Sequence, residues 1–187
     1  MKPAVPTKYG HTKYGHTHSG MWLSRMRIIH SEETDMKSIR LESISMEAAS
    51  DICRHAIAHA RAQGMLPIAV AVLDPRGTLR AFLAEDGTSL LRFDIAFAKA
   101  WGALGMGYGG RALAQRGAAT PLFYNALHAM TDGKVITAPG SVLVRNASGD
   151  VIGSVGISGE TSENDERCAV AGIEQAGLVP DTGAAPA

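Results

Sequence analysis

The chain has 187 residues, with 18 basic and 18 acidic side chains and a formal net charge of zero. This length suits one domain with a sizeable core. The balanced charge gives no global field that would draw the protein to nucleic acid or to an anionic membrane, so neither is expected as a partner. The two cysteines have the spacing of neither a metal finger nor a disulfide framework, which favours a reducing, cytoplasmic compartment.

Residues 1–35 differ in character from the rest of the chain. They contain a direct repeat of Lys-Tyr-Gly-His-Thr, and arginines interrupt their one apolar stretch. No signal h-region or membrane span is therefore expected here. We predict a disordered or partner-held extension, in which His11, His16 and His18 offer a metal no fixed geometry.

The first helix is expected over residues 46–63, with Ser45 as its cap and Gly64 as its stop. His55 and His59 lie four residues apart on its apolar side. This spacing lets two imidazoles share a metal or flank a flat cofactor such as heme. The alternative is a pair of core or interface histidines bonded to backbone carbonyls, because a hydrogen-bonded neutral imidazole can be buried at low cost.

A β-hairpin is expected next, with strands at 68–73 and 78–83. The first of these strands is an unbroken apolar run, which indicates burial on both faces and hence a central position in a sheet. A second helix is expected at about 90–105, with aromatic residues in its inner stripe. On this helix, Arg92 and Lys99 share one flank.

The second half of the chain is expected to contain a helical turn at 112–115 and a short helix at 121–130. Three strands should follow, at 135–138, 141–145 and 150–157, with a hairpin turn between the last two. Segregated strands joined by hairpins indicate an antiparallel α+β sheet with helices packed on it.

The last predicted strand leads into a final helix whose first turn is acidic. Gly153 and Gly156 interrupt the strand, which suggests that another backbone or a ligand comes close there. Thr161 or Ser162 can cap the helix. The acidic residues are Glu160, Glu163, Asp165 and Glu166. Their charge favours a cation or metal over a free anion, unless the carboxylates only complement the helix dipole in water.

Three separated stretches carry a family signature. They are Leu66-Pro-Ile-Ala-Val-Ala-Val-Leu-Asp74 with Gly77, Asp94-Ile-Ala-Phe-Ala-Lys-Ala100, and Gly153-Ser-Val-Gly-Ile-Ser-Gly159 with Asp165-Glu166 and Ala171-Gly-Ile173. In this order they resemble the GlcG/HbpS family, over about residues 40–178. The resemblance implies a profilin-like (GlcG-like) α+β sandwich, with a five-stranded antiparallel sheet covered by helices. It also implies symmetric homo-oligomers and, in some members, binding of heme or iron. The family includes the C-terminal module of PduO-type corrinoid proteins.

The resemblance divides the chain into the extension at 1–35, a GlcG/HbpS-like domain at 36–178 and a flexible C-terminal tail at 179–187. The family usually has a glycine-rich turn before its penultimate strand, and of that glycine run this chain keeps only Gly140. A loop that lines the family's pocket is therefore expected to have changed shape. We expect Gly140 and Gly159 to lie beside a bound cofactor.

Two classes of function remain open, and the first is a small-ligand binding protein for heme, iron or another tetrapyrrole. Its cofactor would lie at a groove formed with a neighbouring subunit. The expected cofactor-binding residues are His55, His59, Gly140 and Gly159. The expected metal ligands are His55, His59, Glu163, Asp165 and Glu166.

The second class is a small catabolic enzyme, an isomerase, hydrolase or deaminase acting on an organic acid from an aromatic, glycolate or diol pathway. Arg92, Lys99 or Arg145 would hold the substrate carboxylate. The candidate catalytic residues are Asp94, Lys99, Glu163 and Asp165. No nucleophile elbow or zinc-protease signature supports a named reaction. A catabolic operon around the gene would favour the enzyme, and a heme-uptake locus would favour the binding protein.

Overall fold

The computed structural model describes residues 42–184, so the predicted N-terminal extension at 1–35 lies outside the described residues. The described part of the chain forms five helices and five strands. In chain order they are α1 (Met46–Ala62), β1 (Ala69–Leu73), β2 (Leu79–Ala84), α2 (Arg92–Met106), α3 (Gly110–Ala119), α4 (Pro121–Met130), β3 (Ser141–Arg145), β4 (Val151–Ser158), α5 (Ser162–Gln175) and β5 (Val179–Asp181).

The strands form one open sheet in the order β2-β1-β4-β3-β5, and every neighbouring pair is antiparallel. All five residues of β1 are buried, as the unbroken apolar run predicts for a central strand. The α+β class and the five-stranded antiparallel sheet are therefore confirmed.

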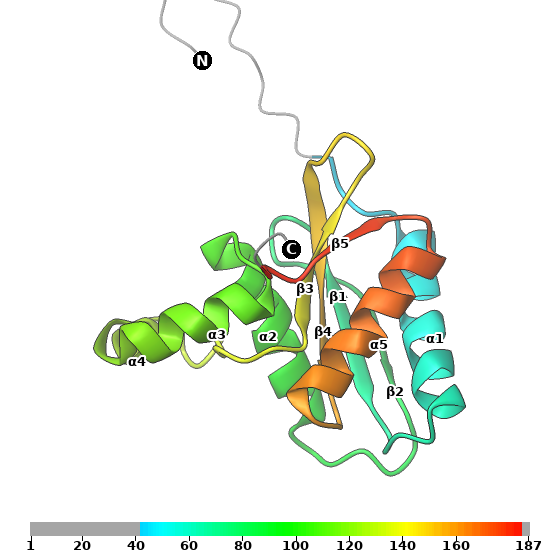
Figure 1. The fold of residues 1–187 in the computed structure, drawn as a ribbon, viewed down its shortest axis with the longest axis horizontal. Helices are drawn as coiled ribbons and strands as arrows, with labels where there is room; N and C mark the ends of the chain where they lie inside the picture. Colours follow the sequence, from blue (N-terminus) through cyan, green and yellow to red (C-terminus); the bar gives the residue numbers. More distant parts are fainter. Residues whose placement is uncertain (1–41, 185–187) are drawn as a thin grey trace, which may run out of the picture. The chain divides into compact units, whose positions relative to one another are not determined.

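Helices cover both faces of this sheet (Figure 1). The helices α1 and α5 lie together on one face, and α2 packs on β4, β1 and β3 from the other. The largest cluster of buried side chains lies between the sheet and the α1/α5 layer. Its largest fully buried members are Ile44, Ile52, Ile68, Ile157, Ile173, Val70, Val72, Val142 and Val144.

The glycines of β4 allow the backbone of neighbouring elements to come close. A Cβ atom at Gly156 would lie 2.0 Å from the carbonyl oxygen of Ala96 in α2, and one at Gly153 would lie 2.5 Å from that of Leu73. Of the two alternatives left open by the sequence, another backbone rather than a ligand therefore occupies the space beside both glycines.

The predicted strand at 135–138 does not form, and the fifth strand is instead β5. Val135 packs against α2, where a Cβ atom on Gly102 would lie 3.3 Å from its side chain. The strand β5 pairs with β3, and Arg145 donates to Asp181 Oδ2. Residues 179–181 are thus part of the sheet and not of the predicted tail. Three residues that include a proline carry no alternation from which a strand could have been predicted.

The helix α2 is found at Arg92–Met106, close to the expected range of about 90–105, although its N-cap residue makes no side-chain hydrogen bond. Another helix differs from its prediction. A full helix, α3, replaces the short turn predicted at 112–115. Gly110 and Gly117 weigh against a helix by propensity. Both glycines are needed here for packing. A Cβ atom at Gly110 would lie 2.8 Å from Ser141 Oγ, and one at Gly117 would lie 2.8 Å from Thr137 Cβ. Among residues 42–184, no helix is long and apolar enough to cross a membrane.

Candidate functional site

The helices α1 and α5 pack closely and leave a groove along their outer side. Gly172 of α5 allows this approach, because a Cβ atom there would lie 2.7 Å from the carbonyl oxygen of Ile52 in α1. The groove, called the α1/α5 groove below, has a volume of about 330 Å³. Its lining residues are His59, Gln63, Glu166, Arg167, Val170, Ala171 and Glu174. An apolar wall therefore stands beside one imidazole and a polar, charged rim.

The two histidines of α1 lie on the side of the helix that faces this groove. His59 lines the groove, and His55 lies one turn earlier and is half-buried. The Nδ1 atom of His55 is buried and has no hydrogen-bond partner among the described residues. His128 of α4 differs, because its Nδ1 atom lies 3.1 Å from the carbonyl oxygen of Val135. The backbone-bonded alternative for the α1 histidines is thus not found at His55 Nδ1.

Glu166 is a buried carboxylate that also lines the groove. Its Oε1 atom accepts a hydrogen bond of 2.7 Å from Arg111 Nε, which belongs to α3. Its Oε2 atom is buried and has no hydrogen-bond partner among residues 42–184. A buried polar atom without a partner carries an energetic cost, so this oxygen is a candidate contact for a bound molecule.

Lys99 and Asp165 form an ion pair where β3 begins and β4 ends. Lys99 Nζ lies 2.8 Å from Asp165 Oδ2 and donates to the carbonyl oxygen of Ile157 at 2.9 Å. The two residues are 4% and 1% exposed, respectively. Burial raises the pKa of Asp165 above its usual value, while Lys99 opposes that shift. The pair joins α2 on one face of the sheet to α5 on the other.

Gly140 makes room for this ion pair. A Cβ atom at Gly140 would lie 2.7 Å from Lys99 Nζ and 2.8 Å from Asp165 Cβ, and its φ of +97° is one that glycine adopts readily. Gly159 likewise meets the chain itself, since its Cβ atom would lie 2.4 Å from the carbonyl oxygen of Pro67. Both glycines predicted to lie beside a cofactor therefore accommodate groups of the protein.

The remaining candidates for catalysis are spread over the molecule. Arg92 Nη1 donates to Ser158 Oγ at 3.1 Å, and Arg145 binds Asp181. Asp94 is exposed on α2, and Glu163 is exposed in the first turn of α5. Of the four predicted catalytic residues, the structure joins only Lys99 and Asp165.

The five predicted metal ligands do not come together as one site. Within residues 42–184, no three His, Cys, Asp or Glu side chains are placed to hold a metal ion. Asp165 is bound to Lys99 and Glu166 to Arg111, while Glu163 is exposed. The residues that do share a location are His59 and Glu166, in the α1/α5 groove.

Sequence reasoning missed most of the groove's wall. Val170 and Ala171 lie on the outer side of α5, together with Arg167. Small and apolar residues on the solvent side of an acidic helix were the available signal, but a helical wheel of α5 alone does not show that α1 lies beside it.

A sequence model of the family described as "Haem degrading protein HbpS-like" matches residues 44–174. The chain belongs to this HbpS-like family. The matched region of this HbpS-like chain includes both histidines of α1 and every residue that lines the α1/α5 groove. No curated protein sequence matches the chain.

Solved structures share the fold of this HbpS-like chain. One is a PduOC:heme complex, with 25% sequence identity and a TM-score of 0.66, covering 76% of this chain and 99% of that one. A second is a double mutant of Streptomyces reticuli HbpS, with 26% identity and a TM-score of 0.64, covering 74% and 90%. A third, Klebsiella pneumoniae protein ORFY, has 24% identity and a TM-score of 0.67, covering 75% and 95%, and shows the fold alone.

Proposed function

We propose that this HbpS-like protein binds heme, or a related tetrapyrrole, in the α1/α5 groove. The observation that carries the proposal is the pair of α1 histidines. His59 lines the groove, and His55 beside it has a buried ring nitrogen with no protein partner among the described residues. Membership of the HbpS-like family and the fold shared with a PduOC:heme complex support the same ligand.

The residues around the groove fit the chemistry of a heme. His59 would hold the heme iron, with His55 one helical turn away. Val170 and Ala171 offer an apolar wall to the macrocycle, and Arg167 on the rim would pair with a propionate. Bound heme would supply an iron centre suited to redox and oxygen chemistry.

Heme fits these side chains better than a free iron ion does. A free ion needs several protein ligands, and the described residues place no three His, Cys, Asp or Glu side chains together. A heme brings four nitrogen ligands of its own and needs one or two from the protein. Lys99 and Asp165, two of the catalytic candidates, hold each other in a buried ion pair and are closed to a substrate.

We also propose that the protein assembles into a homo-oligomer in the cytoplasm. The α1/α5 groove is open on its outer side, so a second protomer would cover the ligand face that one protomer leaves in water. Large apolar side chains are exposed on the described part of the chain, which is typical of a surface that another protein covers. Cys53 and Cys168 are free and buried, as in a reducing compartment.

Titration of the full-length protein with hemin tests the ligand. We expect a Soret shift in the wild type that His59→Ala abolishes and His55→Ala weakens at least tenfold. The matched control is His128→Ala, because His128 lies on α4 and its Nδ1 atom is already held by a backbone carbonyl. Equal hemin binding by the wild type and both α1 variants, with the fold retained by circular dichroism, would contradict the proposal.

A further inference from the structure

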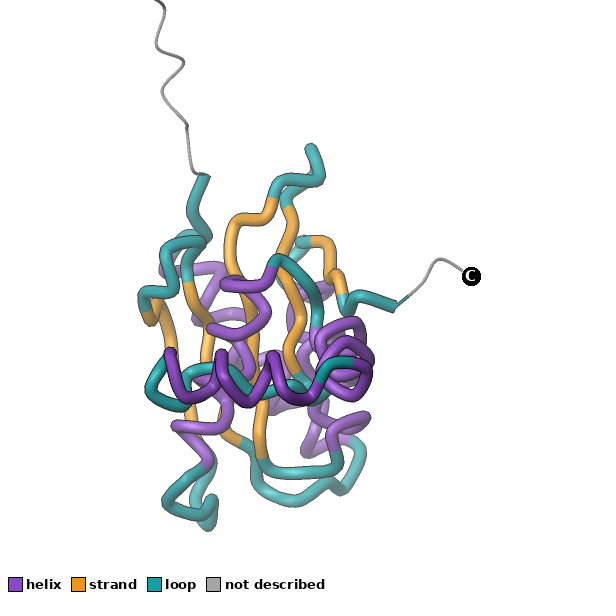
Figure 2. Tube along the Cα trace, turned by 90° about the vertical axis from the view of Figure 1, so that its left-hand side faces the viewer, coloured by secondary structure: helices purple, strands orange, loops and turns teal. Residues whose placement is uncertain are grey.

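The two edges of the sheet differ in how well their backbone groups are protected. One edge is β5, which has three residues and includes Pro180, a residue without a backbone N–H. The other edge is β2, which has six residues and a single charged side chain, that of Arg80. In Figure 2 the strands lie across the view, and the edge on the side away from the C-terminus is that of β2. Short length and a proline protect β5 from pairing with another strand, and β2 has neither.

The pairing of β2 with β1 determines which backbone groups of β2 face outward. The register is regular over residues 81–84, and the Glu85 amide donates to the carbonyl oxygen of Ile68. Because residues alternate in an antiparallel ladder, the N–H and C=O groups of Phe82 and Ala84 then face away from β1. Among residues 42–184, no strand lies on that side of β2. The partner that this edge fits is therefore another extended strand, which can bond to these groups in turn.

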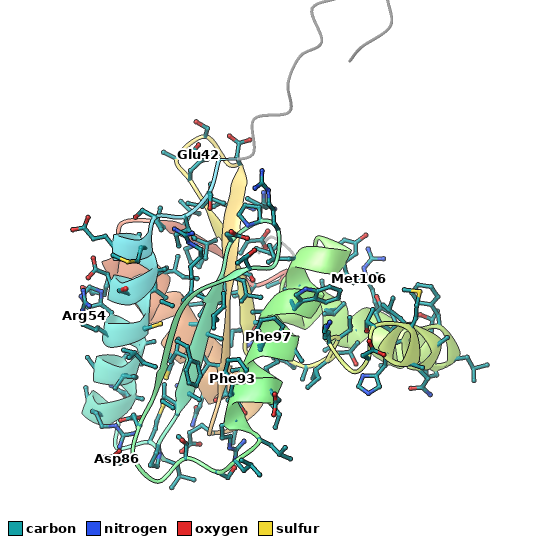
Figure 3. All side chains as sticks on the ribbon, turned by 180° about the vertical axis from the view of Figure 1, so that it is seen from behind. Glu42, Arg54, Asp86, Phe93, Phe97 and Met106 are labelled. Carbon is teal, nitrogen blue, oxygen red and sulfur yellow. The ribbon has the colours of Figure 1, made fainter. Side chains whose placement is uncertain are left out.

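Apolar side chains accompany these backbone groups. Leu79 and Leu83 of β2 are 40% and 41% exposed, respectively. The ring of Phe82, one residue before Leu83, contacts that of Phe93 in α2, with the two centroids 4.8 Å apart. Figure 3 shows Phe93 on α2 and Asp86 in the loop that follows β2. Because successive side chains of a strand lie on opposite faces, a strand beside β2 would cover apolar surface on both faces of the sheet.

Charge shows which strand is complementary to this edge. Arg80 and Asp86 lie at its two ends, and both are exposed. Neither forms an ion pair within residues 42–184. An antiparallel strand of the same sequence brings the basic end of one copy beside the acidic end of the other. Opposite charges that face each other across two strands stabilise the pairing, and a twofold axis provides this contact twice.

The alternation of the ladder restricts the register of two such strands. Phe82 and Ala84 face outward, so each has to pair with an outward-facing residue of the other copy. When Phe82 of one copy pairs with Ala84 of the other, Leu83 faces its own counterpart and Arg80 faces Asp86. A register shifted by two residues in either direction would place Arg80 opposite Ala84 or Thr88, which carry no charge. The register that satisfies the backbone groups and the charges together is therefore the one centred on Leu83.

We propose that β2 pairs antiparallel with β2 of a second copy, so that two five-stranded sheets join into one continuous sheet. Leu83 lies at the twofold axis, and an Arg80–Asp86 pair lies on each side of it. Each copy uses its β2 edge once, so the contact closes as a dimer. None of the residues that line the α1/α5 groove belongs to this edge. This inference rests on the proposed homo-oligomer and adds which surface forms it.

Sedimentation velocity of the full-length protein at micromolar concentration tests the charges. We expect the wild type to sediment as a dimer or a multiple of it. Arg80→Asp and Asp86→Arg should each weaken the dimer about tenfold or more, because like charges then face each other twice. The double variant Arg80→Asp/Asp86→Arg should restore it. The matched control is Arg76→Asp, since Arg76 is an exposed arginine in the turn between β1 and β2. If both single variants associate as the wild type does, or the double variant stays weak, the assigned contact is overturned.

Disulfide formation tests the register directly. In full-length Leu83→Cys the two introduced thiols would face each other with Cα atoms about 4.5 Å apart, which suits a disulfide. Oxidation with diamide should therefore give a covalent dimer, and the native Cys53 and Cys168 are buried. The matched control is Leu79→Cys, equally exposed on the same strand but roughly 25 Å from its counterpart in this register.

The outcomes separate this contact from the assembly on which it rests. A disulfide in Leu83→Cys and none in Leu79→Cys supports the β2 pairing. An oligomeric wild type whose Leu83→Cys variant does not cross-link, or cross-links no better than Leu79→Cys, overturns the contact and leaves the assembly standing. A monomeric wild type contradicts the proposed homo-oligomer and the contact together.

Discussion

The two helical layers of this protein differ in how completely they are packed. The α1/α5 layer buries one continuous cluster of apolar side chains against the sheet, and Gly172 brings its two helices into backbone contact. The α2–α3–α4 layer begins the same way, since α2 packs on three strands, but it ends in α4, where Leu122, Phe123 and Met130 are exposed. The first layer therefore covers an apolar core, and the second ends in apolar side chains that are exposed to solvent.

The two layers also differ in what they leave open to solvent. Residues of the first layer hold the sheet and leave the α1/α5 groove beside His59. Residues of the second layer leave apolar surface in water. Burial of that surface in a contact would lower the free energy. The ion pair of Lys99 and Asp165 joins the two layers at the end of β4.

The largest expected effect comes from breaking this junction. Lys99→Met leaves the Asp165 carboxylate buried without its partner, so we expect a loss of about 3–5 kcal/mol in the free energy of unfolding. The double variant Lys99→Met/Asp165→Leu leaves no buried charge and should recover most of that loss. Urea denaturation measures both.

The exposed ion pair of Arg54 and Asp51 on α1 is the control for the junction. Arg54→Ala removes a pair whose side chains are 61% and 36% exposed, and we expect it to change stability by less than about 1 kcal/mol. If the double variant is as unstable as Lys99→Met alone, the loss of stability comes from altered packing and not from an unpaired buried charge.

The next effect compares one apolar side chain from each layer. Ile52 is fully buried in the α1/α5 layer, so Ile52→Ala should cost about 2–5 kcal/mol. Leu122→Ala on α4 should change stability by less than about 0.5 kcal/mol, because its side chain is in solvent. Urea denaturation measures both. Equal costs would show that α4 is packed within its own protomer.

The first layer was also the part that the sequence predicted best. The helix α1 was expected at 46–63 and is found at Met46–Ala62, because Ser45 caps it and Gly64 follows it. The strand β1 was recognised by its unbroken apolar run. Local sequence signals of this kind agree with the packing of the folded protein, so each of these elements could be predicted from its own residues.

The second layer and the site were predicted less well, because both depend on pairs of distant elements. The strand β5 exists only through its pairing with β3 and carries no periodic signal of its own. Lys99 and Asp165 were named separately as catalytic candidates, and only the fold shows that they neutralise each other. Gly140 was assigned to a cofactor although it makes room for that pair. The histidines were identified from α1 alone, but their groove needs α5.

The reactivity of cysteine thiols also distinguishes the two layers. Cys53 and Cys168 are buried in the first layer, where burial raises the pKa of Cys53 to about 12 and that of Cys168 to about 11. Neither should react with iodoacetamide at pH 8 in the native protein, and both should react in urea. A cysteine introduced by Ala126→Cys, on the exposed face of α4, should react at once in the native protein. Labelling followed by mass spectrometry distinguishes these sites, and rapid native labelling of Cys53 would contradict a closed first layer.

The smallest effect is expected at Glu160, a half-buried residue before α5. Its oxygens accept hydrogen bonds from the Leu66 amide at 2.8 Å, the Thr161 amide at 3.1 Å and Asn164 Nδ2 at 3.2 Å. These bonds favour the charged form and lower the pKa of Glu160 below its ordinary value of 4.5. Because the folded protein holds the pKa down, the stabilisation is fully present above pH 4.5 and is lost as the pH falls through the lowered pKa.

Thermal melts of Glu160→Gln from pH 7 to pH 3 measure this contribution. The variant should melt slightly below the wild type at pH 7, and the difference should shrink below pH 4.5 as the wild-type carboxylate takes up its proton. The matched control is Glu163→Gln, which removes an exposed carboxylate from the first turn of the same helix and lacks the contact to Leu66. If both variants lose stability equally and with the same pH dependence, the effect is that of negative charge near the amino end of α5, and the link from Glu160 to the β1 side of the fold contributes nothing measurable.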